Sequence, residues 1–441
     1  MAVVALALVA LPAAVAAGKP AMVAPGFLPT VAGERVLLIG VDGVLPGEFD
    51  YLLKRGSLPT FARLGREGAT LRYERDPEEP PAAFWTTIAT GLPSPLHGVA
   101  SVDSFRPLGM ETALAVNGPF RWYWAEVARP LGLARQRPLL SNRRSAFTFW
   151  ELVGRGGDKV AAVNWWGTYP AGRLPGLVVA HGGYQLIAEG AAGAVAPESQ
   201  VAGVVDLRRR VESSDDAALR VARAALPADA AAALAGRALL PESFYRQAFK
   251  PEALFQPHAS ALYLPAVDLA ADGWAGGEVA FADLLAAELG ETDRMLGEVL
   301  AMGEGSRAWG TVVVVFDPGR RGGGEGRALL WRRDACGARS AITTAGRSDA
   351  ANVDESTAAG SGEAVAMASR AVETVRPEEL ASGLFRAAGL PQSGELPAPP
   401  GVCRWPNPPA STPTYGRRET PGAAASASDE YLRNLRSLGY V

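Results

Sequence analysis

The stretch RVLLIGVDG, residues 35–43, is a short continuous apolar run that ends at Asp42 and Gly43. Such a run is typical of a β-strand buried on both faces, as the strands of parallel sheets are. Helical patterns follow around residues 48–55 and 59–67, the second with a proline at its first position, where proline is favoured. The chain therefore begins its ordered part with the strand–helix alternation of an α/β fold.

The same alternation continues downstream. We expect further strands at 159–165, 176–181, 260–267 and 311–316, and helices near 145–154, 280–301, 377–388 and 430–438. Strands that alternate with helices predict an α/β fold with a mainly parallel central sheet that is covered by helices on both faces.

Four stretches depart from this alternation. The segments at about 104–145 and 184–258 are predicted to be insertions over the sheet. The stretch 318–375 is rich in Gly, Ala and Ser, and 391–423 is rich in Pro, so both are predicted to be flexible loops.

Composition excludes few classes of protein. A chain of 441 residues, 48% of them apolar, can bury the core of one large domain or of two ordinary ones. The net charge is −3, with acidic and basic residues interspersed, so we expect no nucleic-acid partner.

Residues 1–18, MAVVALALVALPAAVAAG, form an apolar N-terminal run with no charged side chain before Lys19. It is shorter than the roughly 20 residues that span a bilayer. It can be a signal-peptide core that ends in the small-residue box Ala14-Val15-Ala16, although the expected positive residues before the core are absent. It can also be the end of a membrane helix that begins upstream, or, less favoured, a buried helix. Both favoured readings make residues 1–30 a leader or anchor with a linker, and place the domain at 31–441 in the periplasm, outside the cell or on a membrane.

The two cysteines, Cys336 and Cys403, fit neither a zinc cluster nor a redox pair by their spacing. A single disulfide and two unpaired core residues both remain open.

Three predicted strands end at or near an aspartate: Asp42, Asp268 and Asp317. Ligands of open α/β sheets collect at the carboxyl ends of the strands, which makes these residues the first candidates for a site. Each alone can equally be a turn or cap residue.

With these strands in place, the sequence resembles the type I phosphodiesterase/nucleotide pyrophosphatase branch of the alkaline phosphatase superfamily. The segments that carry the resemblance are VLLIGVDGVLPGEFDYLLKRGSLPTFARLGREGA at 36–69, FWTTIATGLPSPLHGV at 84–99, AFTFWELVGRGGDKVAAVNWWGTYPA at 146–171, ELASGLFRAAGLP at 379–391 and EYLRNLRSLGYV at 430–441. The resemblance implies an alkaline phosphatase-like sheet with two metal ions, usually zinc, held by Asp and His, and a Thr or Ser nucleophile at a helix N-terminus. Two cations would neutralise a phosphoryl or sulfuryl group, and the free amides of the helix start would receive its oxygens.

Several functional positions of the family hold other residues here. Asp42 matches the first-strand ligand, and Asp268 and Asp317 match two further metal-binding aspartates, but the paired His positions are Asp272 and Pro318. No His follows His258, so the last His ligand of the family has no counterpart. The nucleophile aligns with Pro81, which has no hydroxyl but suits the first turn of a helix.

Other residues near these motifs are expected to be structural. Thr86 and Thr87 lie inside the next helix, and His97 is expected to be structural. His181 and His258, at the ends of predicted strands, are expected to be core or surface histidines and not metal ligands. Trp85, Trp165 and Trp166 are expected to pack in the core. Glu78 and Glu79 would bring negative charge to the start of that helix, which stabilises the helix but opposes an anion.

The predicted site is therefore an acidic cluster of Asp42, Asp268, Asp272 and Asp317, vestigial or altered. If it binds metal, oxygen ligands favour Mg²⁺, Ca²⁺ or Mn²⁺ over zinc. If it binds none, one or more carboxyls must hold a proton or pair with an arginine such as Arg320 or Arg321, which can equally lie in a solvated loop.

Two functions follow. The favoured hypothesis is a family member without hydrolase turnover that acts as a binding or assembly component at the cell envelope, with a small phosphoester or an envelope component as partner. The alternative is an active ester hydrolase with a rebuilt all-carboxylate metal site, in which metal-bound water replaces the hydroxyl. A purely structural domain on a membrane anchor is a third reading.

Overall fold

The computed structural model describes residues 33–110, 113–116, 120–302, 308–333, 336, 373–418 and 425–441. The N-terminal run with its predicted leader or anchor lies outside the described residues. Among the helices that are described, none combines the length and apolar character needed to cross a membrane.

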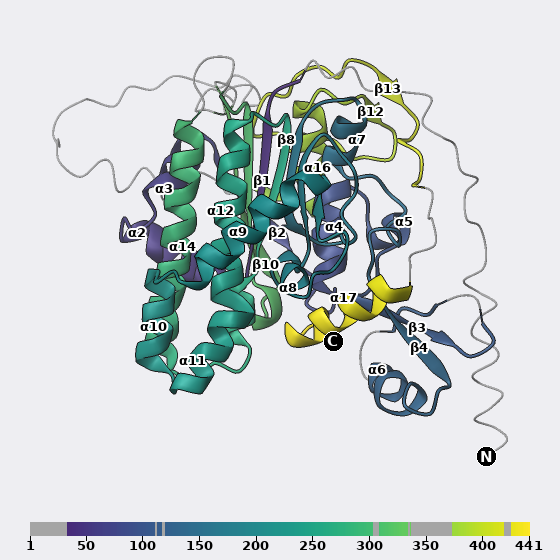
Figure 1. Ribbon diagram of the computed structural model, residues 1–441. Coiled ribbons are helices and arrows are strands. Elements are labelled where there is room, and N and C mark those ends of the chain that lie inside the picture. Colours follow the sequence, from purple (N-terminus) through teal and green to yellow (C-terminus); the bar gives the residue numbers. More distant parts are fainter. Residues whose placement is uncertain are drawn as a thin grey trace, which may run out of the picture.

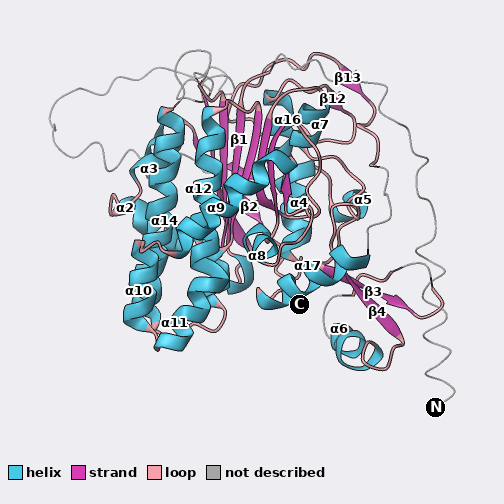
Figure 2. Ribbon diagram, in the orientation of Figure 1, coloured by secondary structure: helices cyan, strands magenta, loops and turns pink. Residues whose placement is uncertain are grey.

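A nine-stranded sheet in the order β11-β2-β10-β9-β1-β8-β5-β6-β7 forms the centre of the molecule (Figures 1 and 2). Its middle consists of five strands that all run parallel: β9 (Thr311–Asp317), β1 (Val36–Asp42), β8 (Ala259–Leu264), β5 (Val160–Trp165) and β6 (Gly176–Ala180). These are the five strands that the apolar runs predict. Every residue of β1, β5, β8 and β9 is buried, which explains their continuous apolar sequences.

The sheet edges are mixed. At one edge, β7 (Val195–Ala196) pairs antiparallel with β6. Strand β2 (Ala69–Glu74) pairs antiparallel with β10 (Glu325–Arg332) and parallel with the short β11 (Glu373–Val375). The prediction of loop across 318–375 is wrong at Glu325–Arg332, because β10 lies between β9 and β2 in the sheet. Its sequence, EGRALLWR, contains an apolar run of only four residues between two arginines, and it follows three consecutive glycines, Gly322–Gly324, which gave the stretch the character of a loop.

Helices cover both faces of the sheet (Figure 2). One layer contains α3 (Pro59–Glu67), α12 (Leu240–Leu254) and α14 (Glu278–Ala301), and the other contains α4 (Pro81–Thr90), α7 (Phe149–Arg155) and α16 (Pro377–Ala387). Together with α2 (Pro46–Lys54) and the C-terminal α17 (Ala425–Ser437), these are helices expected from the sequence, except α12, which lies in the predicted insertion 184–258. The fold class is confirmed.

The two predicted insertions differ in kind. Segment 184–258 adds helices, among them α9 (Val201–Glu212), α10 (Ala217–Ala225) and α11 (Ala228–Leu234), and ends in α12, which packs on β5 and β8. Segment 104–145 is occupied by a hairpin of β3 (Asp103–Pro107) and β4 (Ala134–Pro138) with the short α6 (Phe120–Trp122), which projects from the body (Figure 1). This projecting lobe, residues 103–138, has a small core of its own.

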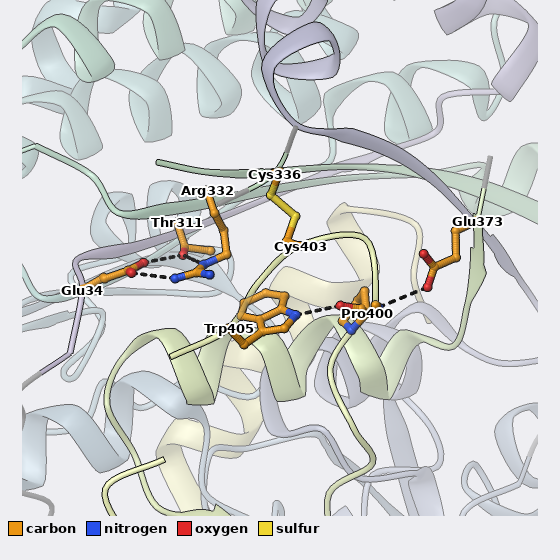
Figure 3. Close-up of a disulfide and its surroundings, with 9 residues drawn as sticks. Glu34, Thr311, Arg332, Cys336, Glu373, Pro400, Cys403 and Trp405 are labelled. Carbon is orange, nitrogen blue, oxygen red and sulfur yellow. Dashed lines mark hydrogen bonds and ion pairs between the residues drawn. A yellow bond between two sulfur atoms is a disulfide. The ribbon is translucent and has the colours of Figure 1, made fainter. Parts of the chain in front are cut away.

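A disulfide between Cys336 and Cys403 joins the chain after β10 to the Pro-rich segment that follows α16 (Figure 3). Beside it, the guanidinium of Arg332 lies over the ring of Trp405, with its carbon 4.9 Å from the ring centroid. The Arg332 Nη2 also donates to Glu34 over 2.6 Å. Of the two readings that the cysteine spacing leaves open, the structure has the disulfide.

The Cys336–Cys403 bond closes a loop with a sequence separation of 67 residues. Because such a cross-link restricts the unfolded chain, we expect its loss to lower the free energy of unfolding by about 2–4 kcal/mol. Thermal unfolding with and without a phosphine reductant measures this. A Cys336→Ser/Cys403→Ser variant should melt at the temperature of the reduced protein and ignore the reductant; equal melting of oxidised and reduced wild type would contradict the expectation.

Candidate active site

Two strand ends and one helix bring three aspartates together at the carboxyl edge of the sheet. Asp42 ends β1 and is the register partner of Asp317, which ends β9. Asp268 lies on α13 (Ala266–Ala271), the short helix that follows β8. All three side chains are fully buried. We call these three residues the aspartate cluster.

Gly319 shows how closely two of these carboxylates approach. A Cβ atom placed on Gly319 would lie 2.4 Å from Oδ1 of Asp268 and 2.5 Å from Oδ1 of Asp42. The residue also has a φ of +60°, so only glycine suits this position, both by space and by conformation. Asp42 and Asp268 therefore face one point, directly below the loop that follows β9.

The fourth predicted acid, Asp272, does not join the aspartate cluster. Its side chain is 50% exposed and lies at the rim, where Oδ2 is 3.4 Å from Arg320 Nη1 and 3.8 Å from Arg237 Nη1. The structure thus brings together three of the four acids and leaves one in solvent.

Arg75 neutralises Asp317. Its Nε lies 3.2 Å from Oδ1 of Asp317, and its side chain is 5% exposed. Arg75 follows β2 directly, and the same strand supplies Tyr73, whose hydroxyl donates to Oδ1 of Asp317 over 3.1 Å. The backbone N–H of Gly319 donates to Oδ2 over 3.1 Å. Strand β2, which was not expected from the sequence, therefore positions the positive charge that neutralises Asp317.

Arg320 neutralises Asp268. Its Nε donates to Oδ2 over 2.9 Å, and its backbone N–H donates to Oδ1 over 2.7 Å. The residue lies in a 3-10 turn, Gly319–Arg321, just after Asp317 and Pro318. The pairing of the aspartates with Arg320 agrees with one of the alternatives that the sequence leaves open. Arg321, the other candidate, binds Glu48 instead, with a 2.6 Å contact from Nη1 to Oε2.

Asp42 has neutral donors only. The hydroxyl of Tyr263 donates to Oδ2 over 2.6 Å, and the indole N–H of Trp85 donates to the same oxygen over 3.2 Å. Burial, and then the charges of Asp268 and Asp317, raise the pKa of Asp42 well above its ordinary value. Burial raises the pKa of Asp317 as well, but there the charge of Arg75 opposes the shift, whereas Asp42 has no arginine. Trp85 serves Asp42 as a hydrogen-bond donor in addition to packing in the core.

The C-terminal segment closes the cluster. The carbonyl oxygen of Gly439 accepts from Nη1 of Arg320 over 3.1 Å, and the ring centroid of Tyr440 lies 5.3 Å from the guanidinium carbon. The ring of Tyr440 also meets that of Trp166 at a centroid distance of 4.8 Å. Residues more than a hundred positions downstream thus fix Arg320 on Asp268.

Helix α4 begins at Pro81, as the sequence predicts for the position that aligns with the nucleophile. Beside this helix start lies Arg75, whose Nη2 donates to the carbonyl of Glu79 over 2.7 Å and whose guanidinium carbon lies 4.6 Å from the ring centroid of Phe84. The Glu79 carboxylate is 3.3 Å from Nη1 of Arg75, whereas Glu78 is exposed. The start of this helix is therefore occupied by Glu79 and by Arg75, and the guanidinium of Arg75 is already paired with Glu79 and Asp317.

Thr86 and Thr87 of α4 are engaged elsewhere. The hydroxyl of Thr86 donates to the carbonyl of Ala82 over 2.6 Å, inside the helix. The hydroxyl of Thr87 lies 3.1 Å from Nε2 of His97. Neither contact involves the aspartate cluster.

The contacts of the three histidines lie outside the aspartate cluster. His97 accepts from the N–H of Val99 at Nδ1, and the His181 ring stacks on Trp166 with centroids 3.9 Å apart. Burial lowers the pKa of both His97 and His181 to about 3, so both rings are neutral at physiological pH. His258 lies at the opposite end of β8 from Asp268, where its carbonyl accepts from Val36 N–H.

The aspartate cluster does not fit a divalent cation. Each carboxylate already accepts hydrogen bonds from two or more donors, and two of the three are ion-paired with arginine. Across the described ranges, no group of three or more His, Cys, Asp or Glu side chains has the geometry to hold a metal ion. A divalent cation would have to displace a guanidinium that the fold packs in place, and the soft nitrogen ligands that zinc prefers do not reach the cluster.

Comparison with known proteins gives one match by sequence family. The family model described as "Type I phosphodiesterase / nucleotide pyrophosphatase" matches residues 36–316. No curated protein matches the chain.

Two solved structures illustrate the structural likeness. Phosphonoacetate hydrolase from Sinorhizobium meliloti, solved in complex with phosphonoacetate, is 14% identical over 68% of this chain and 59% of its own, with a TM-score of 0.39. Murine ectonucleotide pyrophosphatase/phosphodiesterase 5 is 15% identical over 64% of this chain and 56% of its own, with a TM-score of 0.31. The chain thus spans less than two thirds of either protein, and likeness at this level gives no information on its chemistry.

Replacement of Arg75 by methionine should lower the free energy of unfolding by about 3–5 kcal/mol, because it leaves Asp317 buried without its cation. The double variant Arg75→Met/Asp317→Asn removes the charge as well and should regain most of this loss. Denaturant unfolding measures both. Arg72→Met on the same strand is the control, since the Arg72–Glu325 pair is about half exposed and should contribute at most about 1 kcal/mol. A cost for Arg75→Met no larger than for Arg72→Met would show that the pair is unimportant.

Glu79 should make stability depend on pH. Burial raises its pKa from the ordinary 4.5 to about 7, despite the opposing effect of Arg75. The folded protein then holds this proton more tightly than the unfolded chain does, so the contribution is complete below pH 4.5 and is lost as pH rises through about 7.

Glu79→Gln should therefore gain stability relative to wild type between those two pH values, and the exposed Glu78→Gln should not. Thermal melts across this range provide the measurement. A Glu79→Gln difference that is constant with pH would mean that Glu79 does not titrate there.

Proposed function

Because this chain belongs to the type I phosphodiesterase/nucleotide pyrophosphatase family, we propose that it is a member without hydrolase turnover that acts as a binding or assembly component at the cell envelope. The observation that carries the proposal is the pair of arginines in the aspartate cluster. Arg75 on Asp317 and Arg320 on Asp268 supply, from within the chain, the positive charge that two metal ions supply in the family which the sequence resembles.

The electrostatics of the cluster favour this internal arrangement. Two guanidiniums balance two carboxylates, and the third carboxyl, Asp42, has a raised pKa. The buried group thereby approaches neutrality without any bound ion. An anionic ester would find no uncompensated positive charge there, since both guanidiniums are already paired.

The start of α4 gives independent support. Pro81 offers no hydroxyl to attack an ester, and Thr86 and Thr87 use their hydroxyls within the helix layer. Tyr73 and Tyr263 do reach the aspartates, but burial and the nearby carboxylates raise the pKa of both phenols well above the ordinary value. Each hydroxyl is thus a hydrogen-bond donor and a poor nucleophile.

Two features support a place at the cell envelope. The uncharged N-terminal run has the character of an export signal or anchor. The Cys336–Cys403 disulfide suits an oxidising compartment, where such bonds persist. The partner is proposed by class: another envelope component, or a small phosphoester bound outside the aspartate cluster, and no nucleic acid.

Metal analysis joined to ester-hydrolysis assays tests the proposal. We expect the purified protein to retain no stoichiometric divalent metal, and to show no turnover of aryl phosphate, phosphodiester or sulfate esters with millimolar Mg²⁺, Mn²⁺, Ca²⁺ or Zn²⁺. Turnover that Asp42→Asn abolishes would overturn the proposal and favour the hydrolase with a rebuilt all-carboxylate site.

A second arm asks whether the arginines replace the cations. In Arg75→Ala/Arg320→Ala, two of the three buried carboxylates, Asp317 and Asp268, lose their counter-charges, so millimolar Mn²⁺ should raise the melting temperature of this variant and leave that of wild type unchanged. Arg72→Ala/Arg321→Ala is the control with the same change of charge. A wild-type protein that Mn²⁺ stabilises as strongly as the variant would contradict the replacement.

A further inference from the structure

The projecting lobe carries an unusual share of the exposed apolar side chains. Leu108, Leu131 and Leu133 are 76%, 67% and 46% exposed, and Phe120 and Trp122 on the segment between the strands are 76% and 65% exposed. Isolated exposed apolar residues are ordinary, but a group of them on one projection marks an interaction site.

The three leucines form the tip of the hairpin, and we call them the hairpin tip. They lie just beyond the last strand pair, Pro107–Ala134, and the N–H of Leu108 donates to the carbonyl of Leu133 over 2.7 Å. This bond fixes the two arms of the loop side by side. Figure 1 shows the hairpin projecting from the main body, so the tip is a protrusion.

Three arginines stand on one face of the hairpin behind the tip: Arg106, Arg135 and Arg137, the arginine row. Arg106 lies directly opposite Arg135, and Arg137 lies opposite Ser104, so alternation places all three on the same face. The other face holds Phe105 and Ala134, which are buried in the small core of the lobe. The arginine row therefore points away from that core.

Like charges directly opposite each other destabilise a hairpin. Burial and the guanidiniums of Arg106 and Arg135 lower the pKa of Arg137, which shows that the three charges act on one another. Among the ion pairs of the described residues, none joins an arginine of this row to an acid. The repulsion is thus left uncompensated within the described chain, as expected where an anionic partner supplies the missing charge.

From the tip and the row together we infer that the projecting lobe docks onto an anionic lipid surface, with the leucines in the acyl boundary and the arginines at the phosphate level. Protruding aliphatic residues with arginines directly behind them match the two layers of a bilayer surface, apolar below and anionic above. The exposed Trp122 suits the same interface, since indole rings prefer the headgroup level. This inference does not depend on the proposed loss of catalysis.

Vesicle sedimentation with the full chain tests the inference. We expect binding to phosphatidylglycerol-containing vesicles that exceeds binding to pure phosphatidylcholine vesicles and weakens as salt is added. Arg106→Gln/Arg135→Gln/Arg137→Gln should weaken binding to the anionic vesicles by about 100-fold, at about 5-fold for each arginine near the surface. Leu108→Ser/Leu133→Ser should weaken it by about tenfold.

Matched variants separate the lobe from the rest of the chain. The charge control, on α9 and α10, removes the same charge with Arg209→Gln/Arg210→Gln/Arg223→Gln. The apolar control removes exposed apolar groups with Phe255→Ser/Val279→Ser. Both variants should bind vesicles as wild type does. The N-terminal run is common to all variants, so its own binding cancels. Equal losses in the lobe and control variants, or no preference for anionic vesicles, would overturn the inference. So would a wild-type dimer that the lobe variants dissociate, which would make a second copy the occupant.

Discussion

Three carboxylates buried at one sheet edge cannot all remain charged unless positive groups lie among them, and the rest of the site follows from this constraint. Each strand end delivers its acid by the ordinary geometry of a parallel sheet. The fold must therefore supply groups that neutralise these acids. In this chain the groups are the arginine side chains of the protein itself, which need no binding equilibrium and cannot be removed by a chelator.

That choice constrains several other elements. Arg75 requires β2 at its place in the sheet, since the strand end aims the guanidinium at Asp317. Arg320 requires the tight turn at Gly319, whose missing side chain lets the loop approach two carboxylates. Tyr73, Tyr263 and Trp85 complete the shell with neutral donors, so that the third acid can hold a proton. The aspartate cluster thus behaves as a buried polar network of the structure, and its members are mutually dependent.

Sequence reasoning reached the fold and the acids because both rest on local patterns. Continuous apolar runs identified the five parallel strands, and an aspartate after a strand is visible in the chain itself. Arg75 was beyond reach, because ERDPEEP at 74–80 has the composition of a solvated turn, and only the pairing of β2 with β10 carries it inward. The same holds for β10, whose short apolar run follows three glycines, and for Tyr440, whose contact with Arg320 spans 120 positions of chain. The disulfide was open for a related reason, since spacing alone does not tell which cysteines meet.

The hold of Gly439 and Tyr440 on Arg320 has a consequence for biosynthesis. Every strand of the central sheet precedes these two residues in the chain, so a nascent polypeptide can complete the sheet while the lid over its acids is still being made. Gly439 and Tyr440 can then reach Arg320 only after every strand of the central sheet has been made. A chain interrupted before these two residues would contain every strand of the sheet but would lack two of the contacts that hold Arg320 on Asp268.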